Sequence, residues 1–239
     1  MIRTERRGRV LVVTIDRPER RNALDLGRCQ DLLAALREAG DARAVVLAGA
    51  GGNFSAGADL SAVPSGPFLA ALRAVLDAVV DLPVPVVAGI EGVVFGAGLQ
   101  LAVACDLRVA TADSRFAVPA AKLGLVMDHR SVGRLALLAG PGPARALLLA
   151  AEEIDGATAV RLGLVQRAGG VDGAVAWAEE IAALAPLTVA AHKLALNRLE
   201  RTALDPDVEA ARRRAWASAD LAEGVAAFAE RRPPRFEGR

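Results

Sequence analysis

The chain has 239 residues, of which 53% are hydrophobic and 24% charged, and its formal net charge is +1. This length suits one large domain or a core domain with a small appendage, and the charge excludes an acidic tail, a basic nucleic-acid-binding stripe and a disordered chain. We therefore expect a small ligand and no nucleic-acid partner.

Signals for export, membrane insertion and metal binding are missing from the sequence pattern. The two cysteines, Cys29 and Cys105, lie far apart without metal-ligand spacing. The first residues lack the regions of a signal peptide, and Pro83, Pro85 and Glu91 interrupt the most apolar stretch, 82–105. The expectations are a soluble cytoplasmic protein with no membrane insertion, no disulfide, no metal site and no bound cofactor.

The first half of the chain alternates predicted strands and helices. Apolar, β-branched runs at 10–15, 44–48 and 84–90 predict short buried strands. Between them, Asp25 is a candidate N-cap for a helix that ends at Gly40, and a second apolar helix is predicted at about 67–81. The order β, α, β, α, β predicts right-handed crossovers and an α/β core.

After Asp106 the pattern predicts a strand pair and then mostly helices. The strands are expected at 107–110 and 115–118, and helices at 142–151, 157–162, 171–184, 186–201, 207–218 and 221–231. A composition shift near residue 185 separates a core, 1–185, from a helical region of the same structural unit, 186–239. The apolar positions Val189, Leu194 and Leu196 need a partner surface, which another subunit could supply.

Two loops rich in small residues follow predicted strands: GAGGNFSAGADL, 49–60, and GVVFGAGL, 92–99. Open α/β sheets bind ligands beyond the carboxyl ends of their strands, and small side chains let backbone N–H groups approach a ligand. One N–H from each loop would form an oxyanion hole, in which a single donor contributes about 3 to 4 kcal/mol. Each loop alone also fits an ordinary tight turn.

Five motifs, in order along nearly the whole chain, resemble the enoyl-CoA hydratase/isomerase, or crotonase, family: RPERRNALD, FSAGADL, GAGLQLAVACDLRVA, FAVPAAKLGLV and RRPPRF. The resemblance implies a crotonase-like α/β fold of repeated ββα units with a helical C-terminal trimerisation region, assembled as a homotrimer or homohexamer. It also implies an acyl-CoA or enoyl-CoA ligand whose thioester oxygen lies between the N–H groups of Ala58 and Ala97.

Hydratases of this family use two carboxylates, and the matching positions here are Gln100 and Ala120. Neither side chain titrates, so the acid/base work that hydration needs is disfavoured. The chain is especially similar to an actinobacterial subgroup with Gln at the first position. This resemblance implies acyl-CoA binding in fatty acid and lipid metabolism, with weak or absent hydratase activity.

Asp128 leaves an alternative open. Some isomerases and dehalogenases of the family carry a working aspartate at the equivalent point, which would make this chain an active hydratase or isomerase with Asp128 as acid or base. Asp128 also reads as a helix N-terminal carboxylate, or as an ion partner of Arg130 or Arg134. His129 and His192 are expected to be packed or solvated residues. A third reading is a scaffold whose trimeric surface recruits another protein.

The resemblance also implies contacts to coenzyme A. They are expected from Arg17, Ala23, Leu24, Ala56, Asp59 and Leu60, helped by Arg20 or Arg21, and from Arg235 and Phe236 near the adenine and a phosphate. Each arginine could equally well only solvate the surface, and the C-terminal tail could simply be docked or frayed. Apolar residues such as Phe68, Leu69, Leu72, Leu123 and Val126 are expected to shape the acyl pocket.

Overall fold

Among the described residues, the main sheet has six strands, of which five are parallel neighbours. The computed structural model describes residues 1–60, 66–199, 210, 213 and 216–235. In spatial order the sheet contains β1 (Ile2–Arg7), β2 (Val10–Ile15), β3 (Ala44–Gly49), β4 (Val86–Ile90), β6 (Leu107–Ala110) and β9 (Arg167–Ala168). β1 runs antiparallel to β2, and each following pair is parallel. The strands predicted at 10–15, 44–48 and 84–90 are thus confirmed.

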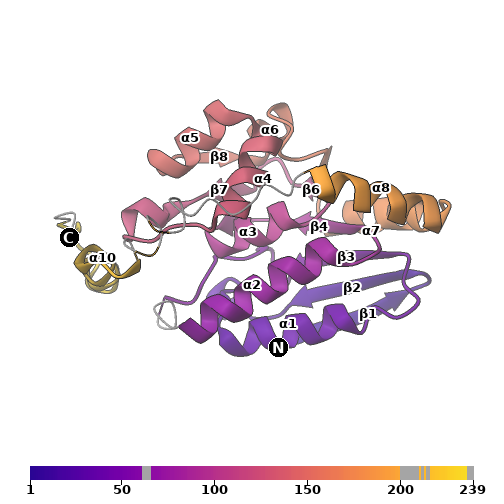
Figure 1. Cartoon of the computed structure of the whole chain (residues 1–239), viewed down its shortest axis with the longest axis horizontal. Coiled ribbons are helices and arrows are strands. Elements are labelled where there is room, and N and C mark those ends of the chain that lie inside the picture. The colour runs from indigo at the N-terminus through magenta and orange to yellow at the C-terminus, as the bar shows by residue number, and fades with distance from the viewer. Residues whose placement is uncertain (61–65, 200–209, 211–212, 214–215, 236–239) are drawn as a thin grey trace.

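Helices cover both faces of this sheet (Figure 1). α1 (Leu26–Arg37) and α2 (Gly66–Asp81) pack on one face, and α7 (Val171–Ala182) crosses the other against β2, β3, β4 and β6. Alternate residues of a strand point to opposite faces, so Val13 joins the core under α1 and α2 while Val12 joins the core under α7. Burial on both faces explains why these strands are apolar throughout.

α1 begins directly after Asp25, its predicted N-cap. The Asp25 carboxylate accepts a hydrogen bond from the backbone N–H of Arg28, and the chain reaches Gly40, with φ of +57°, shortly after the helix ends. The predicted helix at 67–81 corresponds to α2. β1–β2–α1 is one ββα unit, and β4–β5–α3 is a second.

A second, three-stranded sheet combines β5 (Val93–Phe95), β7 (Arg115–Ala117) and β8 (Glu153–Asp155). The predicted pairing of 107–110 with 115–118 is therefore wrong: β6 continues the main sheet, and β7 pairs with β5 and β8. The two segments do not pair because of the turn between β6 and β7. In it, Ser114 N–H donates to Thr111 O, and Arg115 N–H donates to Gly92 O, 2.8 Å away. The chain therefore leaves one sheet and joins the other.

Further helices surround this second sheet. They are α3 (Ala97–Ala104), α4 (His129–Ala139), α5 (Pro141–Leu149) and α6 (Gly156–Arg161). The C-terminal part contributes α8 (Pro186–Leu199) and α10 (Ala219–Glu230), which lie at opposite ends of the long axis in Figure 1. Most of the helix predicted at 207–218 falls outside the described residues.

α8 packs on the body through polar side chains. Lys193 Nζ donates to the carbonyls of Val79 and Val84 and lies 2.7 Å from Asp106 Oδ2, which also accepts from the N–H of Val86. α8 also exposes Leu187, Leu194 and Leu196. Within the described ranges no single helix meets the length and hydropathy of a membrane span; α7 and 186–198 meet them only jointly, across a bend of 113°.

Candidate functional site

A cavity of about 890 Å³ lies where the two small-residue loops, α2 and α10 meet. Its apolar wall includes Phe68, Leu69, Leu72, Leu123 and Val126, which are the residues expected to shape an acyl pocket. The loop residues 56–60 and 95–97 also line the cavity. The cavity is thus apolar, with a small polar edge, as small-molecule sites usually are.

Ser55 holds the two loops together. Its hydroxyl donates to Asn22 O at 2.9 Å and accepts from the N–H of Gly57 at 3.2 Å, and its backbone pairs with Val93 and Phe95. Asn22, fully buried with φ of +59°, donates its amide to the carbonyls of two residues in the first loop, Ala50 and Asn53. These contacts fix the loops relative to each other.

Two N–H groups at this edge are available to a ligand. Leu24 N–H donates to Gly57 O and Leu24 O accepts from Asp59, so the intervening Ala58 directs its own N–H away from Leu24. Ala97 is the first residue of α3, where helical N–H groups lack intrahelical partners. Ala58 and Ala97 both line the cavity, and neither N–H has a hydrogen-bond partner among the described residues.

Glycine is required where the two donors meet. A Cβ on Gly57, whose φ is +96°, would lie 2.6 Å from Phe95 O and 3.2 Å from the nitrogen of Ala97. A Cβ on Gly98 would collide with the carbonyl oxygen of Ser55. The two loops therefore approach each other closely at this point. Two N–H donors on neighbouring loops are what an oxyanion hole requires.

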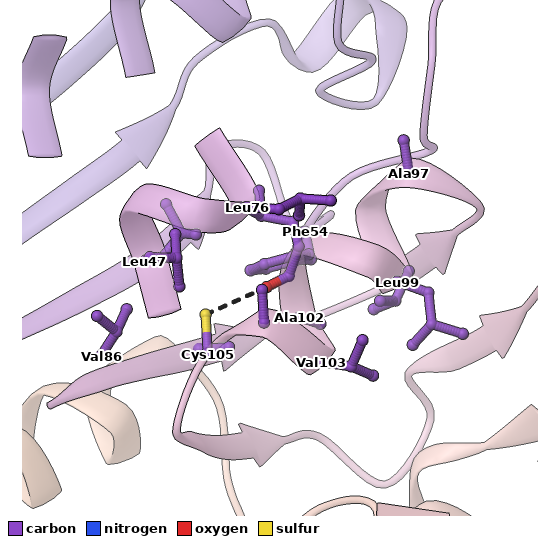
Figure 2. Close-up of a cluster of buried hydrophobic side chains, with 14 of the residues drawn as sticks. Leu47, Phe54, Leu76, Val86, Ala97, Leu99, Ala102, Val103 and Cys105 are labelled. Carbon is purple, nitrogen blue, oxygen red and sulfur yellow. Dashed lines mark hydrogen bonds between the residues drawn. The ribbon is translucent and has the colours of Figure 1, made fainter. Parts of the chain in front are cut away.

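Figure 2 shows the packing that supports α3 from behind. Leu99, Ala102 and Val103 lie among buried side chains that include Phe54 and Leu76, while Ala97 stands at the edge of the cluster. Seven of the eight residues of α3 are buried, and Gln100 is the half-buried exception. The helix is thus rigidly held, and the side chain of Gln100 is left facing the cavity.

Gln100 and Ala120 occupy the positions at which the resemblance places hydratase carboxylates. Both line the cavity, Ala120 from the short helix Pro119–Lys122. The Gln100 amide makes no hydrogen bond to any residue in the described part of the chain, so it can bind a ligand atom or a water. It has no titratable proton near neutral pH, and Ala120 contributes only volume.

Asp128 lines the cavity but serves as the N-cap of α4. Its Oδ1 accepts from the N–H of Ser131 at 3.1 Å and its Oδ2 from the Ser131 hydroxyl at 2.5 Å. The helix N-terminal interpretation is therefore confirmed. Arg130 pairs with Asp77 instead, at 2.8 Å. His129 is half-buried and does not line the cavity, and His192 is exposed.

Replacing Asp128 with asparagine is expected to leave any 3-enoyl-CoA isomerisation rate unchanged, because the group is used for capping. Asparagine caps helices as well as aspartate does, whereas Asp128→Ala removes the cap and costs about 1 kcal/mol of unfolding free energy. Thermal unfolding and isomerase assays of both variants measure this. Loss of turnover in the stable Asp128→Asn protein would contradict it.

The residues expected to contact coenzyme A occupy two layers. Ala23, Ala56, Asp59 and Leu60 line the cavity, together with Arg20 and Arg21, which form no ion pair with a described residue. Behind them, Leu24 is fully buried, and Arg17 Nη1 lies 2.9 Å from Asp59 Oδ2 and 3.4 Å from Asp25 Oδ2. The Arg17 side chain is thus engaged inside the protein. Arg235 is exposed, with its N–H bonded to Glu223, and Phe236 lies outside the described residues.

Sequence reasoning missed the contribution of the C-terminal helix to the cavity. Val225, Phe228 and Ala229 of α10 line it, as does Trp216, whose Nε1 donates to Val126 O at 3.2 Å. The apolar period of α10 was visible in the sequence, but periodicity does not identify the surface that a helix covers. Arg73, on α2, also lines the cavity and pairs with Asp77.

The cysteines are unsuited to covalent chemistry. Burial raises the pKa of Cys29 and of Cys105 to about 12, so neither forms much thiolate near neutral pH. Within the described ranges no three His, Cys, Asp or Glu residues are grouped so that they could hold a metal ion.

Comparison with known proteins agrees with this geometry. A sequence model for enoyl-CoA hydratase/isomerase matches residues 5–239. The probable enoyl-CoA hydratase echA6 of Mycobacterium tuberculosis (strain CDC 1551 / Oshkosh) is 44% identical over 238 residues, covering 96% of each chain. An enoyl-CoA hydratase/isomerase from Pseudoalteromonas atlantica T6c is 32% identical with a TM-score of 0.85 over 99% of each chain. A methylmalonyl-CoA decarboxylase in complex with 2-nitronate-propionyl-CoA is 25% identical with a TM-score of 0.91, over 100% of this chain and 98% of that one.

Proposed function

The chain belongs to the enoyl-CoA hydratase/isomerase family, and we propose that it binds fatty acyl-CoA and enoyl-CoA thioesters with weak or absent hydratase activity. The expected family and α/β fold are confirmed. The observation that carries the proposal is an apolar cavity lined by Ala58 and Ala97, whose N–H groups have no hydrogen-bond partner among the described residues, and by Gln100 and Ala120, which do not titrate. The biological setting would be fatty acid or lipid metabolism.

Weak hydration follows from the chemistry of the reaction. Adding water across a conjugated double bond requires one group to deprotonate the water and one to supply the α-proton, and positioned acid/base groups accelerate such steps roughly 10²- to 10⁴-fold. Gln100 can orient a water but cannot accept its proton. The N-cap contacts of Asp128 argue against its use as a substitute, and so against the alternative of an active hydratase or isomerase. The thioester would be held rather than hydrated.

For the coenzyme, we propose that Arg20 and Arg21 meet phosphates at the cavity edge and that Ala23, Ala56, Asp59 and Leu60 line its path. Arg17 and Leu24 would act from behind, by holding Asp59 and the backbone next to Ala58. The contacts of Arg235 and Phe236 with the adenine end remain part of the proposal.

Assembly as a homotrimer or homohexamer in the cytoplasm completes the proposal. The exposed leucines Leu187 and Leu194 support association, because they are seven residues apart on one face of α8 and exposed apolar side chains on a shared face can mark an interaction surface. Two buried free thiols suit a reducing compartment. Kinship with the actinobacterial members that carry Gln at the first catalytic position is supported by the identity to the mycobacterial relative.

Calorimetry with palmitoyl-CoA, combined with a hydration assay on crotonyl-CoA, tests the proposal. The expected result is saturable binding together with hydration near the uncatalysed background. Turnover at ordinary enzyme rates of about 1 to 10³ s⁻¹, lost in Gln100→Ala, would overturn it. Absence of binding to any long-chain acyl-CoA would instead favour a scaffold that recruits a protein.

A second candidate function is decarboxylation of a 2-carboxyacyl-CoA, favoured by the TM-score of 0.91 to the methylmalonyl-CoA decarboxylase. In this reaction the bond between Cα and the carboxylate breaks, CO₂ leaves, and the electron pair forms a thioester enolate that water then protonates at Cα. No base is needed, and an oxyanion hole stabilises the enolate. Incubation with methylmalonyl-CoA should yield propionyl-CoA and CO₂ in equal amounts. Unchanged methylmalonyl-CoA in the presence of protein that binds acyl-CoA would exclude this activity.

A further inference from the structure

Arg108, on β6, is a buried arginine that does not line the cavity and has no role in the proposed function. It is 1% exposed, and its Nε donates to Leu164 O at 2.6 Å. Its Nη1 donates to Cys105 O at 2.7 Å and to Ala102 O at 3.3 Å, and its Nη2 to Gln166 Oε1 at 3.1 Å. Burying a charge is costly unless its donors are satisfied, and here backbone carbonyls and the Gln166 side chain accept from Nε, Nη1 and Nη2.

Two of these acceptors belong to the C-terminal end of α3. The last carbonyls of a helix have no intrahelical donor, and a cation there complements the helix dipole. Ala102 lies in the last turn of α3, and Cys105 is its C-cap. Arg108 therefore clamps the end of the helix that is opposite to Ala97. At 1.5 Å per residue, the two ends are about 12 Å apart.

Between its ends, α3 is held by apolar packing that has little directionality. The helix is buried on nearly every side by aliphatic side chains and Phe54 (Figure 2). Directional contacts come at the two ends, from the close approach of Gly98 to Ser55 and from the hydrogen bonds of Arg108. A misplacement of about 1 Å at a site can cost roughly 10²-fold in function.

We propose that Arg108 is a positioning residue, which sets the axial position of α3 and thereby the N–H of Ala97 in the oxyanion hole. Gln166 is its support: Oε1 accepts from both the Nη2 and the backbone N–H of Arg108. The ligand-dependent part of this inference rests on the proposed thioester binding, whereas the placement of α3 can be measured without any ligand.

Two readouts on Arg108→Met test the inference. In the free protein, hydrogen–deuterium exchange of the segment 96–105 should rise at least 10-fold while exchange of β2 and β3 stays unchanged. With acyl-CoA labelled with ¹³C at the thioester carbonyl, the downfield shift on binding should fall by half or more. A folded Arg108→Met protein with wild-type exchange and a wild-type carbonyl shift would overturn the proposal.

Matched variants separate positioning from general stability. Asn197→Ala also removes a buried side chain that donates a hydrogen bond to a helix carbonyl, Val80 O, but at the end of α2. It should lower the unfolding temperature and leave the carbonyl shift and the exchange of 96–105 unchanged; equal effects in both variants would refute a specific role for Arg108.

If the Arg108→Met protein fails to fold, variants of the exposed residue Gln166 are used for the same test. Gln166→Leu should raise the hydrogen–deuterium exchange of 96–105, whereas Gln166→Glu, which keeps an acceptor for Arg108, should show wild-type exchange. Wild-type exchange in Gln166→Leu would count against the proposal. If the wild-type protein does not bind acyl-CoA, the proposed function is refuted. The exchange of 96–105 alone would then decide whether Arg108 positions α3.

Discussion

Gly98→Ala is expected to abolish acyl-CoA binding and to lower the free energy of unfolding by about 1 to 3 kcal/mol. The new methyl group would collide with the carbonyl oxygen of Ser55 and lie 2.8 Å from its Cβ. Ser55 cannot yield, because its hydroxyl and its backbone bind Asn22, Gly57, Val93 and Phe95. The start of α3 must therefore move, and the N–H of Ala97 moves with it.

Gly133→Ala is the matched control. Gly133 lies within α4, and a Cβ there would meet nothing within 4 Å. This substitution should preserve binding and stabilise the protein by about 0.5 to 1 kcal/mol, since glycine is the poorer helix former. Denaturant unfolding and calorimetry with palmitoyl-CoA measure both effects. Wild-type affinity in Gly98→Ala would show that the contact between the loops does not form the site.

The double variant Gln100→Glu, Ala120→Glu is expected to gain hydratase activity by about 10²- to 10⁴-fold over the wild-type chain. It returns two titratable carboxylates to the cavity, on the same wall segments that now carry an amide and a methyl group. Since the chain already has the fold of the enoyl-CoA hydratase/isomerase family, we expect that acid/base groups are what it lacks for hydration.

Single variants isolate the cause of this gain. Gln100→Glu alone and Ala120→Glu alone should each give much less activity than the pair, because water activation and α-protonation are both needed. Initial rates with crotonyl-CoA across pH 5 to 9 measure the effect, and the double variant should show a new pH dependence. If the wild-type protein already hydrates crotonyl-CoA as fast as the double variant, missing carboxylates are not what limits hydration.

The sequence allowed prediction of the features that depend on neighbouring residues. The caps by Asp25 and Asp128 were recognisable because each side chain bonds an N–H three residues ahead. Buried strands were recognisable from continuous apolar runs. The strand pair after Asp106 was mispredicted because two short runs separated by a turn are typical of a hairpin, and the competing partner, β5, is too short and too close to a loop to stand out.

The rest of the site depends on contacts between distant parts of the chain. Ser55 is hydrogen-bonded to Asn22, 33 residues away, and Arg108 to Leu164, 56 residues away. No local pattern distinguishes such residues from an ordinary loop serine or a surface arginine. The same limit applies to the ion pair of Arg17 with Asp59, which joins residues 42 positions apart.

A crystal structure with a non-hydrolysable long-chain acyl-CoA analogue would show directly whether the protein holds a thioester carbonyl between two backbone N–H groups without a carboxylate beside the acyl carbons. The carbonyl oxygen next to the sulfur position is expected about 2.7 to 3.1 Å from both backbone nitrogens, of Ala58 and Ala97, with Gln100 as the polar side chain nearest to Cα and Cβ. A carbonyl oxygen bound elsewhere, or a carboxylate from any part of the chain or a neighbouring subunit within hydrogen-bond reach of those carbons, would contradict this expectation.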